Sequence, residues 1–454
     1  MKIIKILKKL DKDTPAEIYY AGEYARDILR HKKNDNIEIL IRNIRFSSIL
    51  KYLKKHGNGY KITNRYSIGS ISIMLGTTNI NISIPTKNRI PNSFFTLEDD
   101  ASDRIFTINS IYIPISDTDK KAIIDIHNGK DCIKDKIIKT IGKASDLIKK
   151  DPSIILRALS ISAKLGYRID NNLFYAIKAN YKLAENISIG IVRRSLIDML
   201  MSKKPSRYLR IMGDLGILHS ILPELNICVG LSQNTKYHKY DVFDHCIIAC
   251  DNAPHDLVIR LAALFHDIGK AQTREEVSNN KVTFYNHEVV GSKIARRILR
   301  RFKFSKDIIY EVSNLVYNHM YNYEPNKWTD AAVRRFIKKA GVEEKDLGSL
   351  DTFPLFLVRK ADRSANGLCL SEISPRQYEL QDRIKRVYEK SKALSVTDLE
   401  INGEILMEEF KLKPGPTIGN VLNYLLSVVI ENQSLNSRDI LIEEASKYLS
   451  AALK

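Results

Sequence analysis

The pattern of hydrophobic and polar positions changes character along the chain. In roughly the first 120 residues, short runs in which apolar and polar residues alternate, such as 70–75 and 80–84, predict β-strands with helices between them. From about residue 121 the spacing of apolar residues becomes helical and stays so, most clearly at 154–159. The pattern therefore predicts an α+β N-terminal region followed by a mostly α-helical remainder.

The length and composition set the broad class of the protein. A chain of 454 residues exceeds what one hydrophobic core organises, so we expect several domains. A hydrophobic content of 44% and a charged content of 28% are typical of a soluble globular protein. No apolar run approaches the roughly 20 residues that a membrane span needs. The five cysteines are odd in number and show no paired spacing, which predicts a reducing, cytoplasmic location and no membrane partner.

The charge points to a class of partner. A formal net charge of +19 creates a field that attracts polyanions, and nucleic acid is the commonest of these. The alternative is a lysine-rich solvated surface that only reflects a compositional bias toward Ile, Lys and Asn. Charge alone leaves both interpretations open.

A histidine and an aspartate stand side by side near the middle of the chain, in residues 265–270. They follow the apolar run 257–264, which predicts a buried helix, and burying two polar side chains without partners costs several kcal/mol. A metal ion supplies such a partner, and further candidate ligands lie upstream and downstream. The predicted set is His245, His266, Asp267, His287, His319 and Asp362. Imidazole and carboxylate suit Mg, Mn, Ni, Fe or Zn far better than calcium, and six ligands allow one octahedral ion or two bridged ions.

The ordered set resembles the HD phosphohydrolase superfamily at each of these positions. We assign His245, His266, Asp267 and Asp362 to one ion, with Asp267 bridging to a second ion held by the remaining two histidines. A water between the ions would attack phosphorus, so Asp267 is predicted to be catalytic. Lys270, one turn after His266, either steadies the phosphate as a second catalytic residue or faces solvent.

Further motifs are spread along most of the chain in a fixed order. Residues 22–27 match a Gly-Gly-x-Val-Arg-Asp loop, residues 104–109 match Arg-Asp-Phe-Thr-x-Asn, and residues 151–158 are similar to a helical neck motif. Lys413 to Gly419 fit a tail motif with a rigid Pro-Gly turn. This layout resembles the class II tRNA nucleotidyltransferase and poly(A) polymerase family, specifically the bacterial CCA-adding enzymes with an appended HD domain.

The resemblance implies a fold and a division into domains. It implies a polymerase-β-like nucleotidyltransferase head at 1–120 and a helical neck at 121–230 that binds RNA or nucleotide. An HD phosphohydrolase domain at 231–390 and a helical tail at 391–454, with a tRNA-binding role, would follow. The matched positions of the nucleotidyltransferase site are Gly22, Arg26, Asp27, Asn36, Glu38, Arg104, Asn109, Asp151 and Arg157.

Several of these positions depart from the family pattern. The Asp-x-Asp pair that would hold magnesium reads Asn36-Ile37-Glu38, and the second glycine of the phosphate loop is Glu23. In the Glu-Asp-x-x-Arg motif, whose acid and guanidinium read the base in the family, the arginine is Ile154. We therefore expect that the head keeps its fold but has lost nucleotidyl transfer.

These features lead to three functional hypotheses. The first is a metal-dependent phosphohydrolase or phosphodiesterase that acts through its HD domain, with one or two divalent ions, on RNA 3′ ends or nucleotides. The alternative is an active CCA-adding or A-adding tRNA nucleotidyltransferase, and the third is a non-catalytic RNA-binding protein. In each case the expected partner is tRNA or a tRNA-like RNA, and a nucleotide is a possible ligand.

Overall fold

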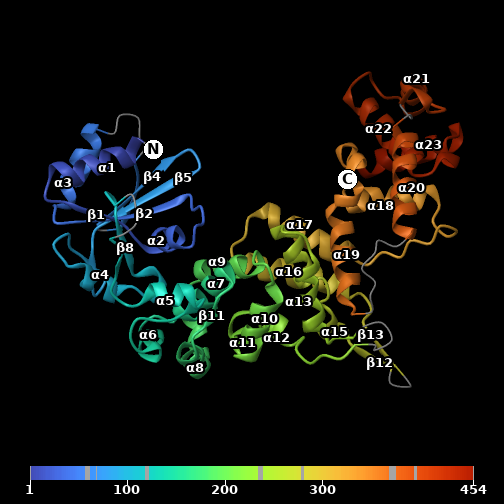
Figure 1. Cartoon of the computed structure of the whole chain (residues 1–454). Coiled ribbons are helices and arrows are strands. Elements are labelled where there is room, and N and C mark those ends of the chain that lie inside the picture. The colour runs from blue at the N-terminus through green and yellow to red at the C-terminus, as the bar shows by residue number, and fades with distance from the viewer. Residues whose placement is uncertain are drawn as a thin grey trace. The chain divides into compact units, whose positions relative to one another are not determined.

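The protein divides into two compact units. The computed structural model describes residues 2–56, 62–67, 69–117, 122–233, 239–277, 281–367, 375–392 and 396–452. The first unit is Met1–Pro223 and the second is Glu224–Lys454 (Figure 1). The predicted fold class, an α+β head followed by a mostly helical remainder, is confirmed. The finer domain boundaries stay predictions, and the one at 120/121 falls outside the described residues.

A seven-stranded sheet organises the head, in the order β3-β4-β5-β2-β1-β8-β9. Strands β2 and β5 pair in parallel and the other neighbours are antiparallel. The strands are β1 (Glu17–Tyr20), β2 (Asn36–Arg42), β3 (Ile62–Ser67), β4 (Ser70–Leu75), β5 (Thr78–Ser83), β8 (Ile111–Pro114) and β9 (Ile124–Asp125). A small hairpin, β6 (Thr86–Lys87) with β7 (Ile90–Pro91), stands apart from the sheet.

The two faces of β2 have different roles. Ile37, Ile39 and Ile41 enter a core built with helices α1 (Lys2–Asp13) and α3 (Phe46–His56). Because side chains alternate along a strand, Asn36 and Glu38 lie on the opposite face, where α2 (Gly22–Leu29) packs. Helix α4 (Leu97–Asp103) also packs on this second face, which therefore carries the polar positions.

Helices complete the first unit. They are α5 (Gly129–Lys134), α6 (Ala144–Lys150), α7 (Ile154–Leu165), α8 (Asn171–Ala179), α9 (Ile189–Leu200), α10 (Pro205–Asp214) and α11 (Ile217–Ile221). Strands β10 (Ile137–Ile138) and β11 (Arg168–Ile169) form a short parallel pair among them. Helix α7 packs along α9 and buries its apolar stripe, so the predicted core stretch 154–159 is a helix at the centre of this unit.

The second unit is built mainly from helices and includes a small hairpin, β12 (Glu275–Val277) with β13 (Lys281–Thr283). Its helices are α13 (Val242–Asn252), α14 (Leu257–Phe265), α15 (Lys270–Thr273), α16 (His287–Arg301), α17 (Lys306–Asn318), α18 (Asp330–Ala340), α19 (Pro354–Ala365) and α20 (Pro375–Lys392). Helix α12 (Pro223–Asn226) lies where the two units join in sequence. Within the described residues, no helix combines the length and apolar character that crossing a membrane requires.

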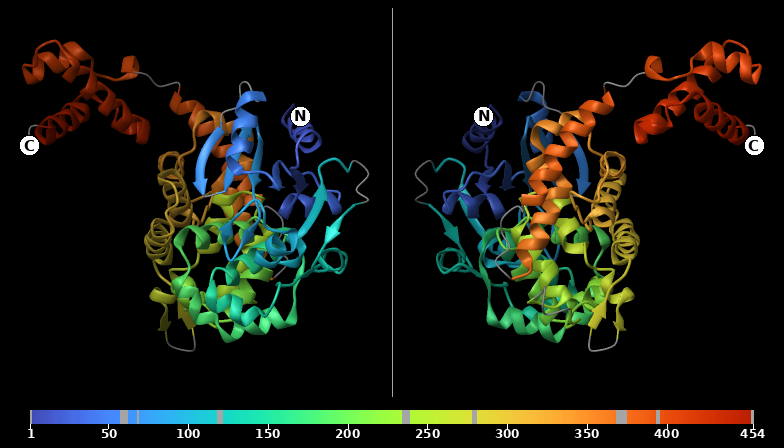
Figure 2. Two further views of the ribbon diagram at one scale, coloured as in Figure 1. Left: turned by 90° about the vertical axis from the view of Figure 1, so that its left-hand side faces the viewer. Right: turned by 90° about the vertical axis from the view of Figure 1, so that its right-hand side faces the viewer.

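The C-terminal helices have a core of their own. Helices α21 (Gly403–Phe410), α22 (Pro416–Glu431) and α23 (Arg438–Ala452) pack against one another (Figure 2). Leu406, Val421, Leu425 and Leu441 are fully buried between them. The rigid Pro-Gly turn predicted at 413–416 precedes α22, whose first residue is Pro416.

Candidate functional sites

The first candidate site begins at the N-terminus of α2. Gly22 has φ +60°, and a Cβ there would lie 1.8 Å from Glu38 Oε2, so no other residue fits. The Glu38 carboxylate accepts a hydrogen bond from the Glu23 backbone N–H and lies beside Arg104. Burial raises the pKa of Glu38, and the Arg104 charge offsets part of that rise. The carboxylate therefore occupies the helix N-terminus, where an anion is favoured.

Two arginines hold this loop against the strands. Arg26 binds Asp27 through Nε at 3.0 Å and reaches Asn109 Oδ1 through Nη1 at 3.1 Å. Arg30 also binds Asp27, at 2.9 Å. These contacts lower the pKa of Asp27 although its burial opposes the shift. Arg26 and Asp27 are thus buried structural partners, as is usual for a charge pair of this kind.

Arg104 is fixed in the same way. Its Nε binds Asp100 at 2.8 Å, and its Nη1 donates to the Asn109 carbonyl at 3.0 Å. Tyr112 donates to the same Asp100 carboxylate at 2.6 Å. The Asp100 charge raises the pKa of Arg104, against the effect of burial, so the guanidinium stays charged. A permanent positive charge is therefore held beside the loop.

A hollow of about 650 Å³ lies next to these groups, between the head sheet and helices α7 and α9. Of the predicted positions, Asn36, Arg104, Asn109 and Arg157 line it. Glu38 and Gly22 lie beside Arg104 at the loop. Glu23 of the loop lines it too. The hollow is also lined by polar residues that the sequence analysis did not single out: Asp103, Ser160, Lys164, Arg194, Ser195 and Asp198. Those on α7 and α9 recur every three or four residues, which is the signal that could have found them.

The base-reading positions lie elsewhere. Asp151 accepts from Arg89 Nη2 at 2.9 Å and from the Ser153 hydroxyl at 2.6 Å. Ile154 is 1% exposed and belongs to the helical core. Neither residue lines the hollow, so the predicted base-reading motif is replaced here by a salt bridge and an apolar side chain.

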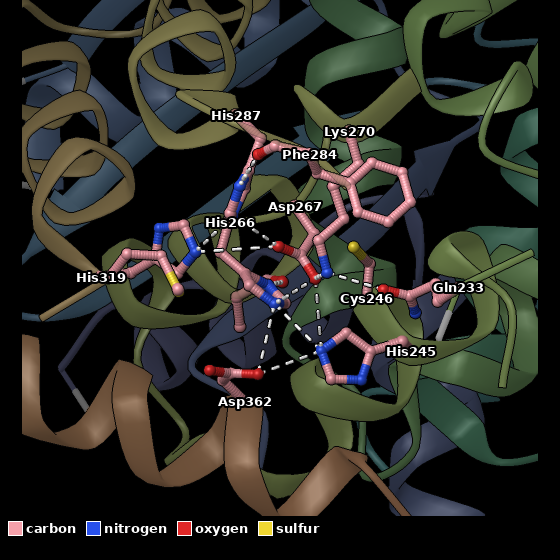
Figure 3. A network of polar contacts seen from close by, with 12 residues as sticks. Gln233, His245, Cys246, His266, Asp267, Lys270, Phe284, His287, His319 and Asp362 are labelled. Atoms are coloured by element: carbon pink, nitrogen blue, oxygen red, sulfur yellow. Dashed lines mark hydrogen bonds and ion pairs between the residues drawn. The ribbon is translucent and has the colours of Figure 1, made fainter. Parts of the chain in front are cut away.

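The second candidate site is a cluster of buried side chains in the second unit (Figure 3). All six predicted metal ligands meet there although they are far apart in sequence. They come from α13, the end of α14, the start of α16, the end of α17 and from α19: His245, His266, Asp267, His287, His319 and Asp362. Two groups that could each hold an ion share Asp267, namely His245 with His266 and His287 with His319.

The distances within the cluster suit metal coordination. His266 Nε2 lies 3.2 Å from Asp267 Oδ2, and His287 Nε2 lies 3.2 Å from Asp267 Oδ1. His245 Nε2 lies 3.1 Å from both His266 Nε2 and Asp362 Oδ1. Ligand atoms that bind one ion at about 2.1 Å lie roughly 3.0 to 3.4 Å apart, in octahedral or tetrahedral geometry. The cluster therefore has the spacing of ligands around ions.

The histidine rings are oriented by the backbone. The Nδ1 atoms of His266, His287 and His319 lie 2.7 to 2.8 Å from the carbonyl oxygens of Ala263, Phe284 and Val316. A ring whose Nδ1–H donates to a carbonyl presents its other nitrogen, Nε2, as a lone pair for a metal. Burial alone would lower the pKa of His266, but the carboxylates of Asp267 and Asp362 raise it to about 10. These two buried carboxylates therefore favour positive charge in the cluster, where Lys270 pairs with Asp267 and Arg359 with Asp362.

Lys270 is not the solvent-facing residue that one interpretation of the sequence allowed. Its ammonium is buried and donates to Asp267 Oδ2 and to Gln233 Oε1, each at 2.6 Å. A second hollow, of about 580 Å³, borders the cluster and is lined by Lys270, Arg359 and Arg363 among others. Lys270 thus fixes the position of the carboxylate that both ligand groups share.

Comparison with known proteins places the chain in a family. Residues 18–139 match the poly(A) polymerase head domain, residues 166–228 match a probable RNA- and SrmB-binding site of polymerase A, and residues 281–445 match a putative tRNA nucleotidyltransferase domain 2. The chain belongs to the class II tRNA nucleotidyltransferase/poly(A) polymerase family. The resemblance to this family is therefore confirmed, and the appended HD domain is not shown.

Curated relatives and solved structures agree with this family. The A-adding tRNA nucleotidyltransferase of Deinococcus radiodurans is 28% identical over 345 residues, covering 72% of this chain and 74% of the relative. The CCA-adding enzyme of Ligilactobacillus salivarius is 24% identical over 99% of this chain and 96% of its own. The Bacillus stearothermophilus CCA-adding enzyme in complex with CTP shares the fold, with a TM-score of 0.65, 17% identity, and coverage of 99% of this chain and 98% of that one.

These comparisons correct the leading functional hypothesis. The relatives are tRNA nucleotidyltransferases, which are transferases, so the prediction of an HD phosphohydrolase is wrong. The matched family models do not show an HD domain, and residues 281–445 match a nucleotidyltransferase domain. The catalytic roles of Asp267 and Lys270 were predicted for that hydrolysis, and no observation tests them. The ligand roles of the six clustered residues stay a prediction.

The expectation that nucleotidyl transfer is lost receives no support from the comparisons, which favour the transferase alternative. The residues at the family's magnesium position nevertheless do not fit a pair of metal ions as they lie. Asn36 is neutral, and the Glu38 carboxylate is engaged by the Glu23 amide beside Arg104.

Proposed function

We propose that this protein is a tRNA nucleotidyltransferase, which transfers nucleotides from CTP or ATP to the 3′ end of tRNA. The observation that carries the proposal is the 650 Å³ hollow that joins the phosphate loop of the head to helices α7 and α9. Its volume suits a nucleotide, since ligand sites commonly measure about 300 to 1,000 Å³. The names of the relatives, which are A-adding, CC-adding and CCA-adding enzymes, support the same assignment.

The charges around the hollow suit a nucleoside triphosphate. Arg104, Arg157, Lys164 and Arg194 line it, against three acidic residues, Glu23, Asp103 and Asp198. The triphosphate belongs at the Arg104 end, where the N-terminus of α2 and a fixed guanidinium favour negative charge. The base then lies toward α7 and α9. The net charge of +19 supports binding of the tRNA backbone over a wider surface.

The chain's own residues position the reacting groups. In the reaction, the terminal 3′ hydroxyl oxygen of the tRNA bonds to the α-phosphorus, the bond to the pyrophosphate oxygen breaks, and the hydroxyl proton passes to solvent. Arg104 stabilises the negative charge that collects on the phosphates. For a phosphate to reach the N-terminus of α2, the Glu38 carboxylate must move away from it. We therefore expect addition that is slow for this family.

The test is incorporation of labelled nucleotide. Purified protein is incubated with tRNA that lacks its 3′-terminal residues, with labelled CTP or ATP and with each of several divalent cations. Addition to this tRNA, and none to a tRNA that already ends in CCA, supports the proposal. No incorporation above a protein-free control with any cation would overturn it.

A double variant sharpens this test. Asn36→Asp with Glu38→Asp restores the two acids on one face of β2 and shortens the side chain that now covers the loop. We expect faster addition by the double variant than by the natural protein. An unchanged or lower rate would contradict the account of Glu38, whereas incorporation by the natural protein would still support the transferase assignment.

We also propose that the histidine cluster of the second unit binds one or two divalent ions. The converging Nε2 atoms, the shared Asp267 and the buried Asp362 support this. The donor set of imidazole and carboxylate fits Mg, Mn, Ni, Fe or Zn. An ion there adds to the positive charge that Lys270 and Arg359 bring to the two buried carboxylates, and its role is to hold five separate helices together.

A further inference from the structure

One acidic side chain stands among cations on the wall that α7 and α9 contribute to the hollow. Asp198, on α9, accepts a hydrogen bond from the Ser160 hydroxyl, and its Oδ1 lies 3.1 Å from the Lys164 ammonium on α7. The Asp198 side chain is 14% exposed and that of Lys164 is 48% exposed. Both residues line the hollow, so a carboxylate and an ammonium lie side by side facing the same space.

The chain needs a base reader other than the one its family motif would provide. Ile154 has no polar atom in its side chain and lies in the core. Asp151 is bound by Arg89 and Ser153 outside the hollow. Neither residue can contact a base bound beside α7 and α9. An acid next to a cation is nevertheless present there, with Lys164 nearly three turns of α7 beyond Ile154 and Asp198 on α9.

We propose that Asp198 and Lys164 read the Watson–Crick edge of the incoming base and select CTP and ATP over UTP and GTP. This inference rests on the proposed transferase function. Cytosine and adenine each carry an amino group, which donates, next to a ring nitrogen, which accepts. A carboxylate accepts from the amino group while an ammonium donates to the ring nitrogen. Uracil and guanine carry the reverse order, a carbonyl next to a ring N–H, and would place their oxygen against the carboxylate.

The neighbouring groups hold the Asp198 carboxylate in one orientation. The Ser160 hydroxyl holds the second oxygen of Asp198, which leaves the first directed to Lys164. Ser160 is itself buried, so this orientation does not depend on solvent. A site that is built to hydrogen-bond a polar group of its substrate discriminates strongly against a substrate that lacks the match.

A structural role makes a different prediction. If the contact only ties α7 to α9, its loss weakens binding of all four nucleotides by the same factor. If it reads the base, its loss changes the ratio between nucleotides. Asp198→Asn keeps the volume of the side chain but adds an N–H₂ group that donates to a carbonyl, so the two roles separate in this variant.

The experiment measures equilibrium binding of CTP, UTP, ATP and GTP to the full-length protein and its variants by titration calorimetry. We expect the natural protein to prefer CTP over UTP and ATP over GTP. Asp198→Asn should reduce each preference at least tenfold, and Lys164→Met should weaken CTP and ATP more than UTP and GTP. Lys178→Met, which removes an exposed lysine of α8 outside the hollow, should change none of these ratios.

Thermal unfolding of each variant serves as the check on folding. If Asp198→Asn unfolds at the same temperature as the natural protein and keeps its CTP/UTP and ATP/GTP affinity ratios, the inference is wrong and the proposed function stands. If the variant is too unstable to assay, Lys164→Met decides the question by the same ratios. If the natural protein binds none of the four nucleotides, both the proposed function and the base reader are overturned.

Discussion

Asp267→Ala should weaken metal binding throughout the cluster, because this one carboxylate serves both ligand groups. Its Oδ2 faces His266 at 3.2 Å and His245 at 3.6 Å, and its Oδ1 faces His287 at 3.2 Å and His319 at 3.7 Å. His319→Ala, by contrast, removes a ligand from one group only. We therefore expect His319→Ala to lose metal from one group and Asp267→Ala to lose metal from both, relative to the natural chain with its one or two ions.

The effect on stability follows from the binding equilibrium. An ion present at 100 times its dissociation constant stabilises the folded state by about 2.7 kcal/mol. One kcal/mol moves the melting temperature of a unit of 150–250 residues by roughly 2 to 4 °C. The unfolding transition of the second unit should thus rise by about 5 to 11 °C when the metal is added, relative to metal-free protein. In Asp267→Ala the same addition should produce a clearly smaller rise.

The assay combines metal analysis with calorimetry. Dialysed protein is analysed for bound Mg, Mn, Ni, Fe and Zn, and then melted with a chelator or with each ion added. The control is Asp307→Ala, which removes an exposed aspartate at the start of α17 and should bind as many ions as the natural protein. Equal metal content in the natural protein and in Asp267→Ala would refute the proposed ligand set. So would an equal metal-dependent rise in melting temperature.

Three further outcomes follow from charges in the structure. Asp27→Ala leaves the buried Arg26 guanidinium without its main partner and should destabilise the head by about 3 to 5 kcal/mol, measured by denaturant unfolding. The folded state lowers the pKa of Asp27. The stability that Asp27 contributes is therefore present above its unfolded pKa of about 3.9 and is lost as the pH falls through the lower folded pKa. The free energy of unfolding of Asp27→Asn should depend less on pH in this range. Affinity for tRNA should fall steeply as salt rises, given the net charge of +19, and a flat salt dependence in a filter-binding assay would contradict phosphate contacts.

Periodicity predicted the parts of the fold that depend on local sequence. The alternating run 70–75 is the strand β4, and the helical stretch 154–159 lies inside α7. The burial of His266 and Asp267 followed from the apolar helix before them, which is α14. These features need only the period of the side chains and the hydrophobic effect, so one sequence is enough to find them.

Contacts between segments that are far apart in sequence could not be predicted, because they depend on how the helices pack in the folded protein. Lys270 was assigned either to phosphate or to solvent, whereas its burial depends on Gln233, which lies 37 residues upstream. Asp198 has no motif around it, and its place beside Lys164 exists only because α9 packs along α7. Motif matching also gave Asp151 a base-reading role because it compares positions and not partners. The partner that removes it from the hollow, Arg89, comes from the head.

Two acidic residues of the head, Glu23 and Glu38, lie together at the N-terminus of α2. An aspartate at position 38 would be one methylene shorter than Glu38, which reaches over Gly22 to the N-terminus of α2. That position is also where a substrate phosphate would be most favoured, because the first N–H groups of a helix and Arg104 converge on it. Under the proposed function, Glu38 takes the place of the phosphate when no nucleotide is bound, because it accepts from the Glu23 N–H and lies beside Arg104. Glu23, which adds a second negative charge at the same loop, raises the pKa of Glu38 further. Glu23 and Glu38 therefore fit a functional loop whose acidic side chains a substrate must displace. A site that had lost its function would not need to retain Gly22, Arg104 and the cations around the hollow, which are all present.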